Sequence, residues 1–194
     1  MLPVSEEFNH LIVNRRTVKP EHFSDRPVER EIIEQVLENA RWAPTHGLNE
    51  PWHFVVFSGA SRHLLSGFLA DWYIRHTKAD KFNELKLSLL KERPLMSDYI
   101  IAICMVRPED TKIPEIEDIE AVACAVQNMH LTATVYGLVA YWSTPGATYS
   151  KEVNSFLGLG ERDRCLGFFY LGYPQNKPPQ GKRTPIEHKL QWLE

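Results

Sequence analysis

Residues 99–136 read YIIAICMVRPEDTKIPEIEDIEAVACAVQNMHLTATVY, and three different patterns follow one another in this stretch. Residues 99–106 are apolar at successive positions, which predicts a strand buried on both faces. Residues 107–118 are polar and contain prolines, which is typical of a loop. Residues 119–136 are apolar almost all round a helix, and Gly137 is placed to end that helix. A strand with two apolar faces predicts a sheet that lies between helices.

Shorter apolar runs on either side of this stretch predict three more strands and several helices. The strands are expected at residues 52–57, 138–142 and 165–173. Helices are expected at residues 5–13, 28–42, 61–90 (as one or two helices) and 151–157, and residues 174–183 form an extended, proline-bearing tail. Strands separated by helices indicate an α/β or α+β class. No repeat or internal linker divides the chain, so we expect a single domain over residues 1–194.

The helix expected at residues 119–136 predicts a partner subunit. A chain of 194 residues rarely surrounds an apolar helix completely by itself. A second copy of the chain is the simplest cover for the outer face of this helix, so we expect a homodimer.

Composition excludes several classes of protein. With 22 Lys and Arg against 25 Asp and Glu, the net charge is −3, which argues against a protein that holds nucleic acid. No run approaches the ~18 apolar residues of a transmembrane helix, and the N-terminus lacks the apolar segment of a secretory signal. The three widely spaced cysteines, Cys104, Cys124 and Cys165, are interpreted as buried, reduced thiols. We therefore expect a cytoplasmic protein without membrane or nucleic-acid partners.

The common catalytic and metal-binding motifs are missing. The eight histidines do not have metal-ligand spacing, so no metal site is expected, and neither G-x-x-x-x-G-K-[ST] nor G-x-S-x-G occurs. His53 and His130 lie in apolar segments and are interpreted as core histidines without a role. Either the protein is not an enzyme, or a cofactor carries its chemistry.

Two basic pairs are candidates for binding a phosphate. Arg15, Arg16 and Thr17 follow the first helix, and two guanidinium groups with a hydroxyl suit phosphate oxygens. Lys182 and Arg183 lie in the tail, which could lead back to the same phosphate. The alternative is that both pairs are solvated, the first near the end of its helix.

Two other segments offer polar side chains where ligands commonly bind. The loop after the second helix carries Pro44, Thr45, His46 and Asn49, although a turn that satisfies its own backbone is an equally good interpretation. Trp142-Ser143-Thr144 lies at the end of a predicted strand, a frequent ligand position in α/β proteins. The alternative for this segment is an aromatic core residue followed by a turn.

Together these segments resemble the nitroreductase family of flavoenzymes. The resemblance rests on Asn14-Arg15-Arg16-Thr17, on Ala43-Pro44-Thr45-His46 leading to Asn49-Glu50-Pro51-Trp52-His53-Phe54, on Leu171-Gly172-Tyr173-Pro174, and on Lys182-Arg183 before Pro185. These motifs follow in the right order over nearly the whole chain. The short length, His46 and Trp142 look most like the compact, minimal nitroreductases of bacteria.

The resemblance implies a fold and a cofactor. The implied fold is α+β, with a central mixed β-sheet flanked by helices, in an interlocked homodimer with FMN at the subunit interface. The implied FMN-binding residues are Arg15, Arg16, Thr17, Lys182 and Arg183 for the phosphate and ribityl chain, Pro44, Thr45, His46 and Asn49 from the other subunit, and Trp142, Ser143 and Thr144 along the ring edge or ribityl chain. Arg16 is the candidate for the positive charge near flavin N1 and O2. No catalytic side chain is implied, because flavin N5 carries the reaction.

The implied activity is an FMN-dependent, ping-pong oxidoreductase that takes electrons from transiently bound NAD(P)H and reduces nitroaromatics, quinones or related small electrophiles. Other flavin chemistry (enone reduction, dehalogenation or flavin cleavage) and a non-catalytic flavin-binding sensor remain alternatives. Glu50 stands where the family usually has Gln, Leu48 where Asn is common, and Ser143-Thr144-Pro145 where a glycine-bearing segment is frequent. These departures concern the flavin edge and the choice of substrate.

Overall fold

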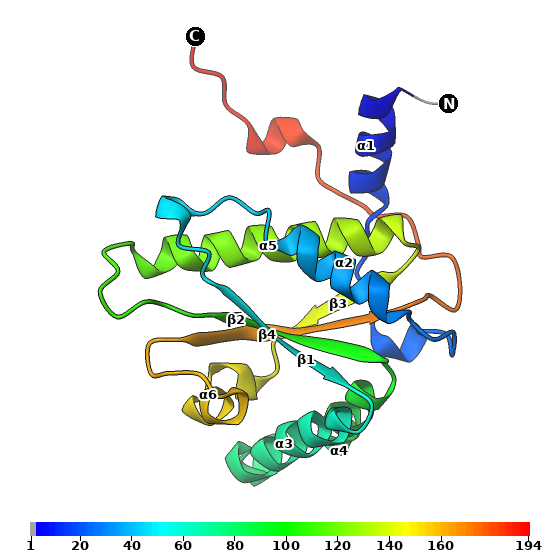
Figure 1. Cartoon of the computed structure of the whole chain (residues 1–194). Coiled ribbons are helices and arrows are strands. Elements are labelled where there is room, and N and C mark those ends of the chain that lie inside the picture. Colours follow the sequence, from blue (N-terminus) through cyan, green and yellow to red (C-terminus); the bar gives the residue numbers. More distant parts are fainter. Residues whose placement is uncertain (1–2) are drawn as a thin grey trace.

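The computed structural model of the protein describes residues 3–194 and is built on one four-stranded sheet (Figure 1). The first two residues of the domain expected over 1–194 lie outside the described part. The strands are β1 (Trp52–Ser58), β2 (Tyr99–Met105), β3 (Val139–Ser143) and β4 (Arg164–Gly172). Their order in the sheet is β1-β2-β4-β3, and every neighbouring pair is antiparallel.

The sheet was expected to be mixed, but its four strands pair only in the antiparallel sense, and a parallel pairing occurs at an isolated bridge. The helix α5 (Glu115–Val135) joins β2 to β3, and these two strands run in the same direction. They do not pair, because β4 inserts between them with the opposite direction. The parallel pairing is that of Thr17 with Ala140 of β3, where the amide of Val18 donates to the carbonyl of Ala140 at 3.1 Å. The predicted α+β class is confirmed.

Helices cover both faces of the sheet (Figure 1). One face packs against α2 (Arg30–Ala40) and α5. The other is covered by α3 (Ser61–His76), α4 (Glu84–Glu92) and α6 (Lys151–Leu157). In Figure 1, α1 (Val4–Asn14) and the C-terminal tail extend away from this layered body on the same side. No side chain of α1 is buried.

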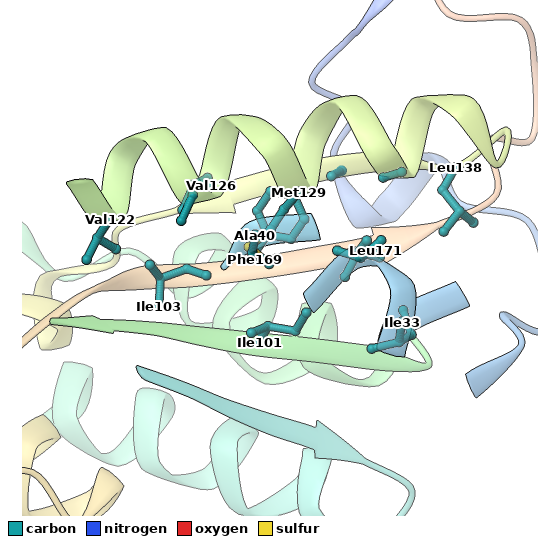
Figure 2. Close-up of a cluster of buried hydrophobic side chains, with 14 of the residues drawn as sticks. Ile33, Ala40, Ile101, Ile103, Val122, Val126, Met129, Leu138, Phe169 and Leu171 are labelled. Atoms are coloured by element: carbon teal, nitrogen blue, oxygen red, sulfur yellow. The ribbon is translucent and has the colours of Figure 1, made fainter. Parts of the chain in front are cut away.

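Strand β2 explains why the core has two halves. Ile101, Ile103 and Met105 point toward α2 and α5, whereas Ile100, Ala102 and Cys104 point toward α3 and α6. Figure 2 shows the first half, in which Val122, Val126 and Met129 of α5 lie over Ile101, Ile103, Phe169 and Leu171 of the strands. The alternation follows from the two-residue period of a strand, so the prediction of a strand apolar on both faces is confirmed.

Helix α5 begins at Glu115, four positions before the helix expected from the apolar pattern. Pro114 precedes it, and Glu115, Glu117 and Asp118 occupy its first turn. Proline near the start and acidic residues in the first turn are favourable at a helix N-terminus, because the free N–H groups there carry partial positive charge. The segment 115–118 is therefore helix, and its assignment to a loop was wrong.

Two further expectations are corrected by the packing. Cys104 and Cys165 are buried, but Cys124 is exposed because it lies on the face of α5 that points away from the sheet. His53 is also exposed, on the edge strand β1, and is not a core histidine.

Across residues 3–194, no helix combines the length and apolar character needed to cross a bilayer.

Candidate functional site

Three arginines from two distant segments meet beside the start of β3. Helix α1 ends at Asn14, and the chain then passes through Arg15 and Arg16 to Thr17, which bridges to Ala140. The C-terminal tail brings Arg183 to the same place, where its charge acts on Arg15. The expected convergence of the two basic pairs thus occurs for Arg15, Arg16 and Arg183.

Arg15 and Arg16 are half-buried, and Arg15 carries the shifted pKa of this cluster. Its burial lowers the pKa of its guanidinium, and the charges of Arg183 and Arg16 lower it further. Among residues 3–194, no carboxylate pairs with Arg15, Arg16 or Arg183 within salt-bridge distance. A bound anion would relieve this repulsion, and phosphate matches the paired N–H groups of a guanidinium.

Arg16 has a different role from its neighbour. Its Nε donates to the carbonyl of Pro179 at 2.8 Å, and its Nη1 donates to the carbonyls of Val13 and Arg15. Gly181 packs so closely on this guanidinium that a Cβ there would lie 2.7 Å from Cζ of Arg16. Arg16 therefore links the tail to the end of α1, and among residues 3–194 its Nη2 has no hydrogen-bond partner, which leaves this nitrogen for a ligand.

The other tail residues of the cluster are exposed. Lys182 lies in solvent, and Nη1 of Arg183 donates to the carbonyl of Lys182 at 2.8 Å. Thr17 is exposed as well, so its hydroxyl is accessible. The cluster is consequently open on its outer side.

His130 of α5 lies in the core near Arg15. It packs edge-on against Phe169 with ring centroids 4.6 Å apart. Burial, with a smaller contribution from the positive charge of Arg15, lowers the pKa of His130 to about 4. The imidazole is therefore neutral at pH 7, as expected for a core histidine.

The loop after α2 is held on the first turn of α5. Nδ1 of His46 lies 2.6 Å from Oε2 of Glu117, and Nδ2 of Asn49 donates to Oδ1 of Asp118 at 2.7 Å. Within the loop, Oγ1 of Thr45 accepts from the amide of Glu50 at 3.2 Å. These contacts place the imidazole of His46 at the surface with one nitrogen engaged.

The backbone of this loop is strained at two residues that carry a Cβ. Leu48 and Glu50 have φ of 55° and 43°, and Gly47, which directly precedes Leu48, has φ of 58°. Residues with a Cβ rarely adopt this left-handed region, so the loop depends on its side-chain anchors. Leu48 is 85% exposed and thus projects from the molecule.

The anchor of the loop is a buried ion pair that sequence reasoning missed. Asp118 is 1% exposed and accepts from Asn49 through Oδ1, while its Oδ2 lies 2.7 Å from Nε of Arg107. Glu117 and Asp118 were overlooked because residues 107–118 were expected to form a loop. Pro114 followed by acidic residues was the available signal for a helix start.

Trp142 is fixed at the end of β3. Its Nε1 donates to the carbonyl of Leu166 at 3.0 Å. Gly167 opposite has φ of 125°, and a Cβ there would lie 2.7 Å from both the carbonyl of Ser143 and Nε1 of Trp142. Only glycine fits so close an approach. Gly167 therefore fixes the path of the chain through Ser143 and Thr144 as it leaves the sheet.

One copy of the chain leaves the candidate residues in three groups. They are the cation cluster beside the start of β3, the segment 142–144 at its end, and the loop 44–50 on α5. Within residues 3–194, no hydrogen bond or ion pair joins the loop to either of the other groups. The same part of the chain contains no group of His, Cys, Asp or Glu that could hold a metal ion.

Comparison with known proteins gives consistent results. A family model described as "Nitroreductase family" matches residues 12–173. YfhC of Bacillus subtilis, named as a candidate NAD(P)H nitroreductase, is 29% identical over 93% of this chain and 91% of its own. A nitroreductase-like family protein from Bacillus cereus has a crystal structure that covers 100% of both chains, with 27% identity and a TM-score of 0.82. The FMN-dependent nitroreductase NfnB from Mycobacterium smegmatis, solved with NADPH, covers 99% of this chain and 100% of its own, with 19% identity and a TM-score of 0.76.

Proposed function

The chain belongs to the nitroreductase family, and on this basis we propose that it is an FMN-dependent oxidoreductase that takes electrons from NAD(P)H. The observation that carries the proposal is the cluster of Arg15, Arg16 and Arg183, three cations without a carboxylate partner among the described residues. The phosphate of FMN carries about two negative charges at pH 7 and suits such a cluster. YfhC and NfnB, whose names refer to NAD(P)H and FMN, support the same cofactors.

Different residues around the cluster bind different parts of FMN. Arg15, Arg183 and Lys182 hold the phosphate, with the hydroxyl of Thr17 as a further donor. Nη2 of Arg16 is the free nitrogen that can reach the ribityl chain or the flavin. Trp142, Ser143 and Thr144 line the ring edge, since they leave the sheet from the same strand that Thr17 bridges.

A second copy of the chain completes the site. The loop with Pro44, Thr45, His46 and Asn49 makes no hydrogen bond to the cluster of its own chain, which supports its contribution to the site of a partner. Phe8 and Ile12 of α1 and Trp192 and Leu193 of the tail are exposed apolar side chains on the two segments that extend from the body. Such segments fit an interlocked homodimer, in which they would pack on the other subunit.

FMN bound here would supply the two-electron redox chemistry between the nicotinamide and a second substrate. The chain holds the phosphate through guanidinium groups, keeps the segment 142–144 fixed through Trp142, and holds His46 and Asn49 on α5. For a quinone the net reaction is NAD(P)H, a proton and quinone giving NAD(P)⁺ and hydroquinone. Nitroaromatics, quinones and related electrophiles are the proposed acceptors.

Free thiols at Cys104 and Cys165 fit a reducing compartment such as the cytoplasm.

Anaerobic spectroscopy tests the function. Purified protein loaded with FMN should be yellow, lose its colour when NADH or NADPH is added, and regain it with a quinone or nitroarene. A protein that does not bind FMN would contradict the proposal. A protein that stays yellow with both nicotinamides would instead be a flavin-binding sensor.

A further inference from the structure

Two of the three cysteines face each other across neighbouring strands of the sheet. Cys104 of β2 pairs with Cys165 of β4, and both side chains lie in the core half that α3 and α6 cover. The proposed flavin chemistry uses neither thiol. We propose that the pair is an oxidisable dithiol, in which Cys165 reacts with hydrogen peroxide or another small peroxide and Cys104 then forms a disulfide with it.

The strand register suits a disulfide between these two residues. Ile103 pairs with Gly167, and the next pair is Cys104 with Cys165. Leu166 is therefore the extra residue of a β-bulge, which brings Cys165 opposite Cys104 and onto the same face of the sheet. Directly opposed residues of antiparallel strands have Cα atoms about 4.5–5.5 Å apart, and disulfides usually join Cα atoms about 4.4–6.8 Å apart.

The two thiols interact, and the interaction makes them unequal. The hydrogen bond with Cys104 lowers the pKa of the Cys165 thiol. The same bond, together with burial, raises the pKa of the Cys104 thiol. Because the thiolate is the nucleophile, Cys165 is the member of the pair that attacks an oxidant, and Cys104 is the member that resolves the product.

A cavity gives a small molecule access to Cys165. The cavity measures about 510 Å³, and Cys165 lies in its wall, whereas Cys104 does not. Thr148 lines the same cavity and is 2% exposed, and its Oγ1 has no hydrogen-bond partner within residues 3–194. This hydroxyl is therefore available to donate to an oxygen of a peroxide that lies beside the thiol.

The charges around the cavity favour a neutral ligand. Its positively charged lining residues are Lys151 and Arg164, and its negatively charged ones are Glu115 and Glu161. Nε of Arg164 lies 3.1 Å from Oε1 of Glu115. Because the two signs balance, the lining has no net charge that would concentrate an anion. Hydrogen peroxide is neutral at pH 7 and close to water in size, so it meets both requirements.

The proposed oxidation has two steps. The Cys165 thiolate attacks one oxygen of hydrogen peroxide, so that an S–O bond forms, the O–O bond breaks, and the released hydroxide takes up a proton to become water. The Cys104 thiol then attacks the sulfur of this sulfenic acid, which forms the S–S bond and releases the remaining oxygen, with the Cys104 proton, as water. In total, two thiols and hydrogen peroxide give a disulfide and two water molecules.

Thiol titration and peptide mass spectrometry of the full chain carrying Cys124→Ser test this assignment. The substitution removes the exposed cysteine, so that the remaining thiols are those of the pair. After hydrogen peroxide is added to the native protein, we expect both thiols to be lost, the peptides that contain Cys104 and Cys165 to be linked, and dithiothreitol to restore the thiols. The measurement requires neither flavin nor nicotinamide, so its result is independent of the proposed function.

Single variants in the Cys124→Ser background test the order of the two steps. With Cys104→Ala, Cys165 should accumulate as a sulfenic acid that dimedone captures. With Cys165→Ala, Cys104 should react at least about tenfold more slowly, because it is fully buried and does not line the cavity.

Thr148→Val tests the contribution of the cavity. It removes an unpartnered hydroxyl and should slow the loss of thiols several-fold while the protein stays folded. Ser155→Ala, an exposed position of α6 outside the cavity lining, is the matched control and should not change the rate.

The Cys124→Ser protein decides the outcome even where a core variant does not fold. If it keeps both thiols in the native state, or loses them without a link between the two peptides, the inference is wrong. Equal rates of oxidation at Cys104 and Cys165 in the single variants would contradict the assignment of Cys165 as the residue that reacts first.

Discussion

The guanidinium of Arg183, close to the C-terminus, lies near enough to that of Arg15 at the end of α1 for its charge to lower the pKa of Arg15. Two like charges are held together here although neither has a carboxylate partner among the described residues. Since such repulsion is unfavourable, a cluster of this kind indicates that an anion belongs between the charges. The FMN phosphate is the anion that the account assigns to it.

The tail reaches this cluster through Arg16, so Arg16→Ala should release it. The substitution removes hydrogen bonds to the carbonyls of Pro179, Val13 and Arg15. We expect trypsin to cleave after Lys182 and Arg183 roughly three- to tenfold faster, because the segment opens more often. Mass spectrometry of a digestion time course measures this rate. Arg30→Ala, at an exposed ion pair of α2, is the matched control; equal cleavage rates in Arg16→Ala and wild type would show that Arg16 does not hold the tail.

Asp118→Asn should destabilise the protein. The substitution leaves the largely buried Arg107 without its close carboxylate partner and weakens the anchor of Asn49. Breaking a buried pair from one side typically costs about 3 kcal/mol, which we expect as the loss in free energy of unfolding. Urea denaturation followed by circular dichroism measures it.

A double variant separates the unpaired charge from other effects of this substitution. Arg107→Met with Asp118→Leu removes both charges and should recover most of the lost stability. Asp110→Asn removes an exposed carboxylate and should change the free energy of unfolding by less than about 0.5 kcal/mol. A loss no larger than that in Asp118→Asn would mean that the pair does not anchor the loop.

His130 should make the fold sensitive to acid. Its pKa is about 4 in the folded protein, below the value of about 6.5 for an exposed histidine. Between these values the unfolded chain binds a proton that the folded one does not, so stability falls as the pH drops from about 6.5 toward 4. At pH 5 this group alone should cost about 2 kcal/mol relative to pH 7.

The variant His130→Gln isolates this effect, because all other titrating groups remain. We expect its free energy of unfolding to decline by about 2 kcal/mol less than that of the wild type between pH 7 and pH 5. Denaturant titrations at the two pH values provide the comparison. Identical declines in the two proteins would exclude His130 as the source.

Periodicity predicted the elements of the fold better than their arrangement. The apolar positions of β2 alternate between two core halves, and those of α5 face the sheet, so both elements could be predicted locally. The insertion of β4 between β2 and β3 depends on pairings such as Cys104 with Cys165, which join distant parts of the chain. No local pattern contains that information.

The sequence predicted candidate site residues, and the structure brings some of them together. Arginine pairs and a proline-bearing tail indicated a common phosphate, and Arg15 and Arg183 do lie together. The use of Arg16 as a tie could not be predicted, because its acceptors are backbone carbonyls that are alike at every position. Asp118 was overlooked because a buried carboxylate in a polar segment resembles a solvated one until its partner Arg107 is placed.

Comparison of FMN with riboflavin tests the central claim most directly, since riboflavin has the same ring and ribityl chain without the phosphate. Flavin fluorescence titrations should show that the wild type binds FMN at least about a hundredfold more tightly than riboflavin. Arg15→Ala and Arg183→Ala should each weaken FMN binding about tenfold or more and leave riboflavin nearly unchanged, whereas Arg30→Ala should change neither. A wild type that binds both flavins equally, or an Arg15→Ala variant that retains the full preference for FMN, would contradict the assignment of the arginine cluster to the phosphate.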